Sequence, residues 1–526
     1  MKKIDLRKAL LAVFICGSAM FASANEVYVS ATGNDSNDGA SSATPYATLG
    51  KALTSVDENG TIHVSGLIYT CNDPLNPVGD GDLGTGLQIS KNVTIEGDAV
   101  TSGFVGFDEV VTWQAGRMFR ITAGTLTLKT LTLTNGYGFN KAGAVHVNGG
   151  ALVAENVIFE NNHAVDGESQ PAGGAIQVDK TTGISFKSCL FKSNVALKGG
   201  AFYIQDTQNA SVELRFEACS FIGNRSNQGG ASCSGLFFRL AAENPTVNII
   251  NCTFSGNVNG GNGGTVYIYG VPTSATFNII NTTMVDNIGT SGGGSGAGIK
   301  QEEVTNRPTL RILNSIIEGN AVNSGTTAED LVYGYEPFSS QLQVSNSFIG
   351  NVWVAAGTIP EESYTGNTYW NYMSRTFNRF ELQSGVDVLD ANLNVYKLSE
   401  GSNAVAYGNA TFLQNIGINT DALGGIRTFA NGKCSAGAIE YGASSSITPV
   451  DLQDAVSIEQ QEGRLTVKTT ESSSINLTLY AVSGQSVAQQ SARGTALSAP
   501  VGQLKGLYIA RVSLNGKVYT QKVRIK

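Results

Sequence analysis

Phe159-Glu160-Asn161-Asn162 opens a series of segments in which an apolar residue is followed, three positions later, by asparagine. The later members are Phe191–Asn194, Phe221–Asn224, Phe254–Asn257, Met284–Asn287, Ile317–Asn320 and Phe348–Asn351, so the asparagines recur every 30 to 33 residues. Between them lies a second repeated unit, which is Gly-Gly-Ala at 173–175, 199–201 and 229–231 and Gly-Gly-Thr at 263–265. A fixed period of this length indicates a solenoid, in which each repeat buries its apolar face against its neighbours.

Each repeat carries the two-residue period of a β-strand. Apolar residues alternate with polar ones, as at Val157 and Phe159 or at Ile176 and Val178, and this alternation is typical of a pleated strand. Asparagine and glycine end each run where the backbone turns or takes a positive φ. Strands stacked in register place like residues about 4.8 Å apart, with Phe on Phe inside and Asn on Asn at a corner. The sequence therefore predicts an all-β fold built on a parallel β-helix.

Composition and charge narrow the range of partners. The chain has 526 residues, of which 14% are charged, and its formal net charge is −8 with a pI near 5.1. An acidic chain without basic runs is a poor ligand for nucleic acid or for an anionic membrane surface. We therefore expect neither as a partner.

The first 24 residues have the features of a cleavable secretory signal peptide. Basic residues precede an apolar run at 9–21, and Ala22-Ser23-Ala24 provides a cleavage site before Asn25. The alternative is lipidation at Cys16, where Ile15 occupies a position at which a small residue is expected. No other apolar run is long enough to span a bilayer, so we expect an exported mature chain without a transmembrane segment.

Six cysteines remain after cleavage, and three of them share one position in the repeat. Cys189, Cys219 and Cys252 each precede the repeated phenylalanine by two residues, so they fall in one inward column. Adjacent rungs bring Cα atoms within disulfide range, and exported proteins meet an oxidising compartment. The alternative, which we prefer, is that the thiols stay reduced and pack as small hydrophobes. No Cys-x-x-Cys or histidine-rich spacing indicates zinc, and we expect neither a metal nor a cofactor.

The start of the mature chain predicts a cap on the solenoid. Leu49, Ala52 and Val56 follow helical spacing, and a short amphipathic helix here would cover the first rung. Residues 27–39 and 44–49 resemble the N-terminal segment of secreted bacterial right-handed β-helix proteins of the pectin-lyase-like type. This resemblance implies a right-handed solenoid and no particular activity.

The polar loop at 34–39 has two interpretations. Its Asn, Ser and Asp residues with Gly39 mimic part of a calcium-binding loop, but Pro45 occupies the place of the bidentate glutamate. We therefore favour turn chemistry for this loop.

Two further resemblances concern the solenoid itself. The repeated Gly-Gly-Ala-Ile and Phe-x-x-Asn units are similar to those of the chlamydial polymorphic outer membrane proteins, whose β-helical passengers act as surface adhesins; the β-barrel of that family is not evident here. Residues 398–440 resemble the closing segment of secreted bacterial β-helices, with Asp-x-x-Gly-x-x-Arg at 421–427 and Gly-Ala-Ile-Glu at 437–440. Ser435 stands where that segment usually has aspartate. We predict that the β-helix spans 25–442 and is followed by a linker at 443–455.

A small β-domain is predicted at 456–526. Alternating runs at 465–467, 475–480, 508–512 and 518–525 read as strands, and Asn515-Gly516 is a hairpin signal. The segments 479–485, 505–509 and 522–526 resemble, in order, the motifs of the C-terminal sorting domain of type IX secretion cargo. The resemblance implies a β-sandwich that engages the type IX secretion machinery, in a Bacteroidetes-like Gram-negative host, with the chain reaching the cell surface or the extracellular space. A sugar-binding sandwich module is the alternative.

Catalytic motifs are sparse. Arg307 and Arg311 incompletely resemble the Arg-x-Pro-x-x-Arg of pectate lyases and are weak catalytic candidates; a surface loop entering a strand explains them as well. Asn419-Thr420-Asp421 matches one polygalacturonase motif without its companions, and we treat it as coincidence. The three histidines are scattered.

Strand alternation yields one binding candidate. The second residue after the Ala position of each Gly-Gly-Ala unit should point outward and stack from rung to rung. We predict from this a rough, exposed ridge that could stack on and hydrogen-bond to a glycan. Its members would be His146, Gln177, Tyr203, Cys233, Tyr267 and Lys300. Ordinary strand surfaces also carry Tyr and Gln, which is the competing explanation.

These observations predict an exported cell-surface β-helix protein. The first hypothesis is a non-enzymatic adhesin or glycan-binding passenger, with a polysaccharide or host-surface glycan as partner. The second is a β-helical polysaccharide lyase or glycoside hydrolase whose active groups lie in loops at 72–84, 302–311 or 329–338. The third is a structural surface rod. Low charge and the missing motif sets favour the first over the second.

Overall fold

The structure is a computed structural model. It describes residues 25–70, 86–106, 116–139, 141–165, 171–206, 212–227, 231–290, 297–302, 308–322, 327–333, 342–353, 370–372, 384, 386–442, 456–461, 463–481, 486–504, 506–514 and 517–525. The predicted signal peptide, Cys71, Arg307 and the linker at 443–455 lie outside these ranges. The chain divides into two compact units between Ala443 and Ser444.

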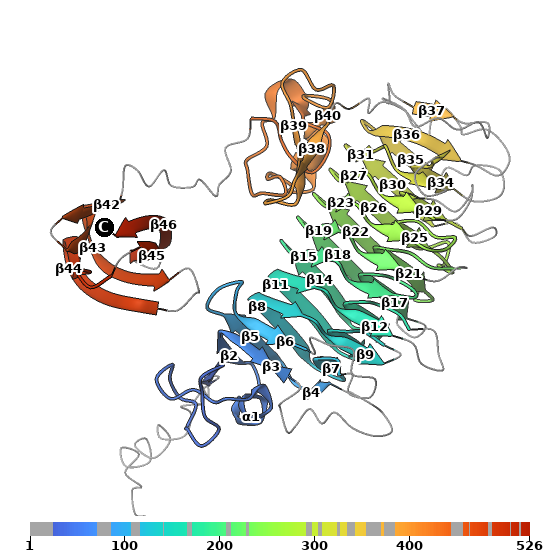
Figure 1. Ribbon diagram of the computed structural model, residues 1–526. Helices are drawn as coiled ribbons and strands as arrows, with labels where there is room; N and C mark the ends of the chain where they lie inside the picture. The colour runs from blue at the N-terminus through green and yellow to red at the C-terminus, as the bar shows by residue number, and fades with distance from the viewer. Residues whose placement is uncertain are drawn as a thin grey trace, which may run out of the picture. The chain divides into compact units, whose positions relative to one another are not determined.

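The first unit is a parallel β-solenoid, as predicted (Figure 1). Its strands stack in columns, and we number the columns 1 to 4. Column 1 consists of β1 (Glu26–Ser30), β2 (Gly60–Ser65), β5 (Val93–Gly97), β8 (Thr125–Thr134), β11 (Ala151–Glu160), β14 (Gly183–Lys187), β18 (Glu213–Glu217), β22 (Thr246–Ile250), β26 (Thr276–Ile280), β30 (Thr309–Leu313) and β35 (Leu342–Ser345).

Column 2 continues each rung after a sharp turn. It consists of β3 (Leu67–Tyr69), β6 (Gly103–Val105), the second halves of β8 and β11, β15 (Leu190–Lys192), β19 (Ser220–Ile222), β23 (Thr253–Ser255), β27 (Thr283–Val285), β31 (Ile316–Ile317) and β36 (Phe348–Trp353).

Column 3 holds the strands that follow the glycine-rich units. It consists of β4 (Leu87–Ile89), β7 (Phe119–Ile121), β10 (Val145–Asn148), β13 (Ile176–Lys180), β17 (Phe202–Asp206), β21 (Leu236–Leu240), β25 (Val266–Ile268), β29 (Ile299–Gln301), β34 (Leu331–Tyr333), the end of β36, and β37 (Trp370–Tyr372).

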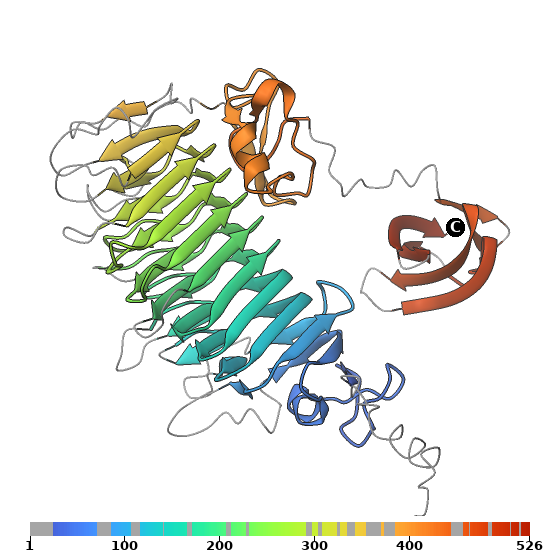
Figure 2. The same cartoon turned by 180° about the vertical axis from the view of Figure 1, so that it is seen from behind.

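Column 4 is made of very short strands at the remaining corner. Its parallel members are β9 (Tyr137–Phe139), β12 (His163–Val165), β16 (Val195–Ala196), β20 (Arg225–Ser226), β24 (Val258–Asn259), β28 (Ile288–Gly289) and β32 (Ala321–Val322), with β33 (Thr327–Ala328) added antiparallel. Figure 2 shows the stacked rungs from behind.

The interior is a continuous apolar stack. Phe159, Phe191, Phe221 and Phe254 lie face to face, with ring centroids 4.6 to 4.8 Å apart and interplanar angles of 4° to 10°. The sequence predicted this stack and placed Phe348 in its last rung. In the structure, Ile349 takes that inner position and pairs with Ile317, whereas Phe348 packs outside the solenoid core. The inner register therefore shifts by one residue at this rung.

A ladder of buried asparagines runs beside the ring stack, at the predicted corner. Asn224 shows the pattern: its Nδ2 donates to Phe191 O (2.8 Å) and to Asn257 Oδ1 (3.0 Å). Its Oδ1 accepts from the backbone N (3.0 Å) and the Nδ2 (2.9 Å) of Asn194. The ladder comprises Asn162, Asn194, Asn224, Asn257, Asn287 and Asn320, all fully buried. Each amide is satisfied without water, which is what burial of a polar group requires.

The sequence predicted that Asn351 would be the last member of this ladder, but the structure has a different residue there. Asn320 donates instead to the carboxylate of Asp330, with its backbone N at 2.8 Å and its Nδ2 at 2.7 Å from Oδ1. Asn351 lies within β36. A carboxylate suits the last position because it accepts both bonds and has no donor left to satisfy.

The turn between columns 1 and 2 uses the left-handed backbone region at every regular rung. Its occupants are Thr130, Asn156, Ser188, Ala218, Asn251, Asn281, Asn314 and Asn346, all with φ between 47° and 55°. This conformation costs an ordinary residue about 1–2 kcal/mol, whereas asparagine visits it readily. The frequency of asparagine here thus follows from the backbone.

We expect Ala218→Asn to stabilise the protein by about 0.5–1 kcal/mol, because asparagine adopts the left-handed conformation of this turn more readily than alanine does. The shift of the urea denaturation midpoint measures the effect. Ala218→Gly should move the midpoint in the same direction. A loss of stability in both variants would show that the turn conformation is not the cause.

Column 1 carries outward charges of alternating sign. In-register pairing would place like charges one strand spacing apart, which is destabilising, whereas opposite charges attract. The successive residues are Glu96, Lys129, Glu155, Lys187 and Glu217, followed by Ile250, Ile280 and Leu313. The switch from charged to apolar side chains marks where another part of the chain covers the column.

That cover is residues 386–442, which we call the lateral module. It contains β38 (Val386–Asp390), β39 (Val395–Leu398), β40 (Gly408–Asn409), α2 (Ala410–Asn415), the 3-10 turn Ala430–Gly432 and β41 (Lys433–Cys434). Figures 1 and 2 both show it beside the upper rungs. Its apolar side chains form two clusters with outward residues of the rungs: Val285, Ile316 and Phe348 in one, and Ile250 and Ile280 in the other. The predicted closing segment therefore packs along the side of the solenoid, and its described residues add no rung.

Arg427 ties the lateral module together and to the rung beside it. Its side chain is completely buried and donates to Glu440 Oε2 (3.2 Å), to Gly437 O (3.0 Å) and to Asn251 Oδ1 (2.8 Å). Glu440 also accepts from the backbone N and the hydroxyl of Ser435. Ser435 thus supplies a polar bond here although it replaces the usual aspartate.

The N-terminal cap matches expectation. Helix α1 (Leu49–Ser55) begins with Thr48, whose hydroxyl accepts from the Lys51 N–H, and it buries Leu49 and Ala52 in the solenoid core. Asp35 accepts bonds from Ala47 N (2.8 Å) and Thr48 N (2.9 Å). Within the loop, Asn34 Oδ1 accepts from Ser36 N (2.9 Å) and Asp38 Oδ1 accepts from Ala40 N (3.0 Å), which are the side-chain-to-backbone bonds of turns.

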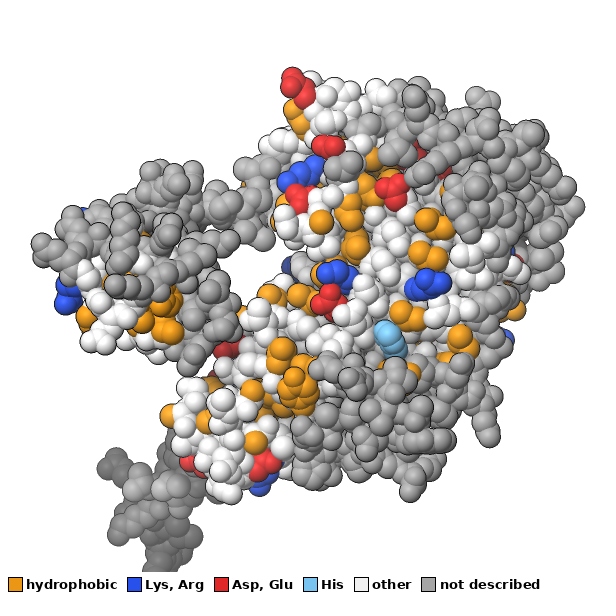
Figure 3. Space-filling model, viewed as in Figure 1, with side chains coloured by type: hydrophobic (Ala, Val, Ile, Leu, Met, Phe, Trp, Pro, Cys, Tyr) orange, Lys and Arg blue, Asp and Glu red, His pale blue; other side chains and the backbone are white. Residues whose placement is uncertain are grey.

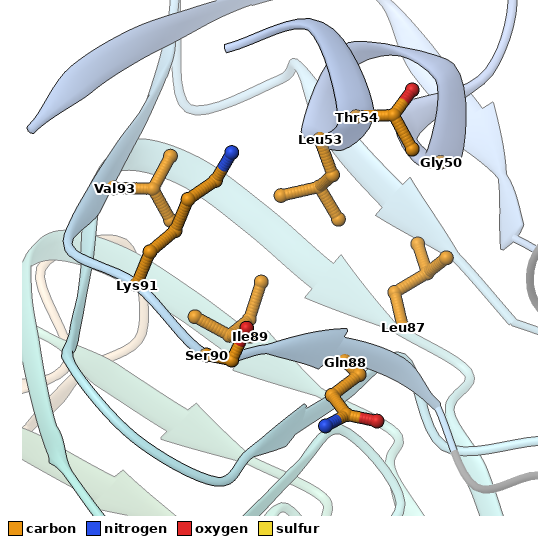
Figure 4. A pocket seen from close by; sticks show the side chains of 9 residues that line it. All are labelled: Gly50, Leu53, Thr54, Leu87, Gln88, Ile89, Ser90, Lys91 and Val93. Carbon is orange, nitrogen blue, oxygen red and sulfur yellow. The ribbon is translucent and has the colours of Figure 1, made fainter. Parts of the chain in front are cut away.

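A pocket of about 310 Å³ lies between α1 and β4. Figure 4 shows Leu53 pointing from the helix toward Leu87 and Ile89, with Lys91 at one side. Lys91 donates to the carbonyl of Val56. The walls combine the aliphatic side chains of Leu53, Leu87, Ile89 and Val93 with polar groups.

The second unit is an antiparallel sheet of β42 (Val456–Gln461), β43 (Arg464–Ala481), β44 (Ser486–Pro500), β45 (Gly506–Leu514) and β46 (Lys517–Ile525). Leu514 pairs with Lys517, in agreement with the predicted hairpin. Two predicted strands, 465–467 and 475–480, are parts of the single strand β43. The strand β44 was not predicted, because its sequence has few β-branched or aromatic residues.

Candidate functional site

The predicted ridge residues do stack in one column, on the outer side of column 3. The pairs His146–Gln177, Gln177–Tyr203 and Tyr267–Lys300 are in register. One member differs: Phe237 pairs with both Tyr203 and Tyr267. Cys233, which was predicted at this place, lies in the preceding loop.

The prediction that this ridge is exposed is wrong. The exposed fractions are 3% for His146, 5% for Gln177, 5% for Tyr203, 0% for Tyr267 and 7% for Lys300. Tyr203, Phe237 and Tyr267 form a small apolar cluster with Ala172 and Cys233, which come from the loops leading into column 3. The alternation of the sequence correctly predicted that these side chains point away from the solenoid core. It could not show that residues of the preceding loops cover them. Glycan binding by these residues stays a prediction.

Polar members of the buried column form an ion-pair network. His146 Nδ1 lies 3.0 Å from Arg117 Nη1, and His146 Nε2 lies 2.9 Å from Asp179 Oδ2. The guanidinium can only donate, so His146 Nδ1 accepts and Nε2 carries the proton. Burial lowers the pKa of His146, although Asp179 opposes this effect. The ring is therefore a neutral connector with both nitrogens engaged.

Asp179 is the anionic centre of this network. A β-bulge in β13 leaves it without a partner in β10, and its carboxylate accepts from Lys141, His146 and Gln177. Burial raises the pKa of Asp179, but the hydrogen bonds from His146 and Lys141 outweigh burial and hold the pKa well below its usual value. Asp179 is thus ionised and neutralised by its neighbours.

A more accessible row lies one alternation step beyond the buried column. We call it the outer strip and define it as Asp179, Gln205, Arg239 and Tyr269. Gln205 pairs in register with Arg239, and the Arg239 Cζ lies 5.8 Å from the centroid of the Tyr269 ring. Arg239 is exposed, and the other three are half-buried. The sequence reasoning missed this row, although Tyr267-Ile268-Tyr269 places a second tyrosine on the same side.

Lys198 flanks the outer strip. It stacks with Ala172 and Lys141 through single bridges between successive loops. Burial and the nearby charge of Arg239 lower the pKa of Lys198. Lys198 and Arg239 form no ion pair with any residue that the structure describes.

Lys300 closes the buried column at the other end. Its Nζ donates to Asn262 O (2.5 Å), lies 3.6 Å from Glu302 Oε2 and sits 5.7 Å from the centroid of the Tyr267 ring. Burial lowers the pKa of Lys300 to about 8, although Glu329 opposes the shift. A lysine of this pKa is partly neutral near pH 8 and could accept a proton.

Arg311 lies on a different face from these residues. Its Nε donates to Gln343 Oε1 (2.9 Å), and its Nη1 lies 3.4 Å from Asn278 Oδ1. These side chains continue a hydrogen-bonded outward row of column 1 through Asn248 and Glu213. The structure therefore places Arg311 in a surface ladder, and its companion Arg307 lies outside the described residues.

Three cysteines stack in the core, as predicted. Cys189, Cys219 and Cys252 are free thiols, at most 2% exposed, and Cys252 Sγ lies 3.4 Å from Phe216 O. Burial raises the pKa of Cys189 and Cys252. Burial also acts on Cys219, but hydrogen bonds from the Cys189 and Cys252 thiols outweigh it and lower the pKa of Cys219. All three side chains pack in the core as small groups shielded from solvent.

The first unit is thus a parallel β-solenoid with a charged and aromatic outer strip on one sheet. The chain matches no model of a protein family, no curated protein and no solved structure. Within the described ranges, no group of three or more His, Cys, Asp or Glu residues could hold a metal ion. No helix in these ranges is long and apolar enough to cross a membrane.

Proposed function

We propose that this protein is an exported, surface-displayed β-solenoid that binds carbohydrate through the outer strip without cleaving it. The observation that supports the proposal most directly is the grouping of a carboxylate, an amide, a guanidinium and a phenol ring on adjoining rungs. Sugars are bound by aromatic faces that contact their C–H groups and by planar polar groups that bond their hydroxyls.

The rigidity of the strip supports binding. The strip stands on column 3, whose inner side chains belong to the packed core, and the buried column beside it is held by hydrogen bonds to Asp179 and by ring contacts. A preformed surface loses little conformational entropy when a ligand binds. Parallel rungs about 4.8 Å apart also present their side chains at a regular spacing, which suits a linear polymer.

Other faces are less suited to this role. On the face seen in Figure 3, acidic and basic side chains lie singly or next to one another among polar and hydrophobic atoms. On column 1, Asn248, Asn278 and Arg311 are already bonded to one another or to their neighbours in the same row.

Export and surface display are part of the proposal. They rest on the signal-like first 24 residues and on the sorting-domain motifs near the C-terminus. The antiparallel sheet of the second unit includes the described parts of these motif segments, residues 479–481, 506–509 and 522–525. A separate all-β unit at this place supports the sorting-domain proposal.

We expect the double variant Arg239→Ala/Tyr269→Ala to weaken binding of the full chain to immobilised polysaccharides at least tenfold, because it removes the guanidinium and the stacking ring. Retention on a panel of plant and host polysaccharides measures the effect. Asn278→Ala, another outward polar residue on a strand, is the matched control and should bind normally. Equal retention of all three proteins would rule out the outer strip as the site.

Polysaccharide cleavage by a lyase is the second candidate, and Lys300 is the observation that favours it. Its lowered pKa is suited to removing a proton beside a uronate carboxylate. Its 7% exposure opposes this role, because a substrate must reach the amine.

A further inference from the structure

We infer that the carbohydrate bound at the outer strip is anionic, bearing carboxylate or sulfate groups. This inference rests on the proposed function and adds the ligand class. The supporting observation is a set of cations on one sheet face that have no acidic partner among the described residues, in a chain whose formal net charge is −8.

The two central cations are Lys198 and Arg239. Lys198 precedes β17 by four residues, and Arg239 lies on the neighbouring strand β21, in register with Gln205 of β17. Neither is ion-paired within the described part of the chain. The neighbouring network is different, because there Lys141 and His146 share the carboxylate of Asp179. The carboxylate of the strip, Asp179, is already bonded to Lys141, His146 and Gln177 and pairs with neither cation. Lys198 and Arg239 therefore repel each other, and a bound anion would relieve that repulsion.

A third cation extends the set along the solenoid axis. Arg120 pairs in register with His146, is half-buried, and its Nε has no hydrogen-bond partner. The registers run from His146 through Gln177 and Tyr203 to Phe237, the residue two before Arg239. Arg120 and Arg239 are therefore about 19 Å apart along the axis, at four strand spacings. A polymer lying along the axis with repeated anionic groups would reach both.

The chemistry of these groups fits carboxylate and sulfate equally. A guanidinium donates two parallel hydrogen bonds to either anion, and the ammonium of Lys198 adds a point charge. The nearby phenol of Tyr269 lies under Arg239 and offers a ring face for the sugar itself. The site would thus bind both the anionic group and the sugar ring of an acidic glycan.

The test measures binding of the full chain to four immobilised probes: hyaluronan, which carries carboxylates only, heparin, which also carries sulfates, dextran, which is neutral, and polyglutamate, a carboxylate polymer without sugar. The test variant is Lys198→Met/Arg239→Gln. The control is Lys187→Met/Arg215→Gln, which removes the same charge from column 1.

The expected result is binding to hyaluronan or heparin that falls at least tenfold in the test variant and less than twofold in the control, with dextran and polyglutamate bound weakly. Tighter binding to hyaluronan would identify carboxylate as the preferred anion, and tighter binding to heparin would identify sulfate. Dextran bound as tightly as the acidic glycans, or equal losses in both variants, would overturn the inference and leave carbohydrate binding intact. Polyglutamate bound as tightly as the glycans would overturn it in favour of general charge attraction. No binding to hyaluronan or heparin by a protein that is retained on neutral members of the polysaccharide panel would overturn the inference alone, and no retention on any member of the panel would overturn the proposed function as well.

Discussion

Replacing Asn224 with alanine is expected to destabilise the solenoid by about 4 kcal/mol, because it breaks the buried amide ladder at its centre. The substitution removes the Oδ1 that accepts two bonds from Asn194 and the Nδ2 that serves Phe191 O and Asn257 Oδ1. All of these groups are buried, so water cannot replace the lost bonds. Thermal unfolding monitored by circular dichroism, together with a urea titration, measures the loss.

The matched control is Asn278→Ala. Asn278 also donates a side-chain amide bond to the asparagine of the adjacent rung, at 2.9 Å, but it is half-exposed. Its loss should cost less than about 1 kcal/mol because water takes over the bonds. If the two variants lost the same stability, the buried ladder would not be the source of rung cohesion.

The second large effect is expected for Arg427→Met, which should cost about 3–5 kcal/mol in the stability of the lateral module. The substitution leaves the carboxylate of Glu440 buried without its cation and removes the bond to Asn251 that joins the module to the rung. We expect residues 386–442 to exchange amide hydrogens much faster, whereas the core rungs keep their protection. Hydrogen exchange followed by mass spectrometry resolves the two regions.

A double variant separates the loss of the ion pair from the loss of packing. In Arg427→Met/Glu440→Leu no charge is stranded, so protection of the lateral module should recover in part. Unchanged exchange in Arg427→Met alone would mean that the apolar contacts, such as those of Phe348 and Ile280, hold the module without the ion pair.

The sequence correctly predicted the features of the fold that recur in every rung, namely the phenylalanine stack and the asparagine ladder. Phe159 and Asn162 recur at a fixed period, and a repeated residue in a parallel stack can only meet its own counterparts, so both ladders followed from spacing alone. The prediction failed at the last rung, where Asn351 lies in β36 and Asp330 takes the place in the ladder. The asparagine spacing there continued through a loop of different length, and the pattern could not show that the inner register had shifted by one.

The candidate site was predicted less completely, for a physical reason. Alternation fixes which side of the sheet Tyr203 and Tyr267 face, but their burial depends on loops whose residues do not repeat. The same argument applied two residues further on would have found Tyr269 and Arg239, because these lie on the same side of the sheet and remain accessible. The pairing of Asp179 with His146 depends on a β-bulge, which no periodic pattern reveals.

The central claim is that the solenoid retains a polysaccharide without cleaving it. The most direct measurement is to incubate the full chain, with and without calcium, with each polysaccharide that it binds, and to assay both retention and new chain ends. The account predicts retention that depends on Arg239 and Tyr269, with no new ends at any pH between about 6 and 9. New ends that disappear in Lys300→Met would contradict it and make this protein an enzyme.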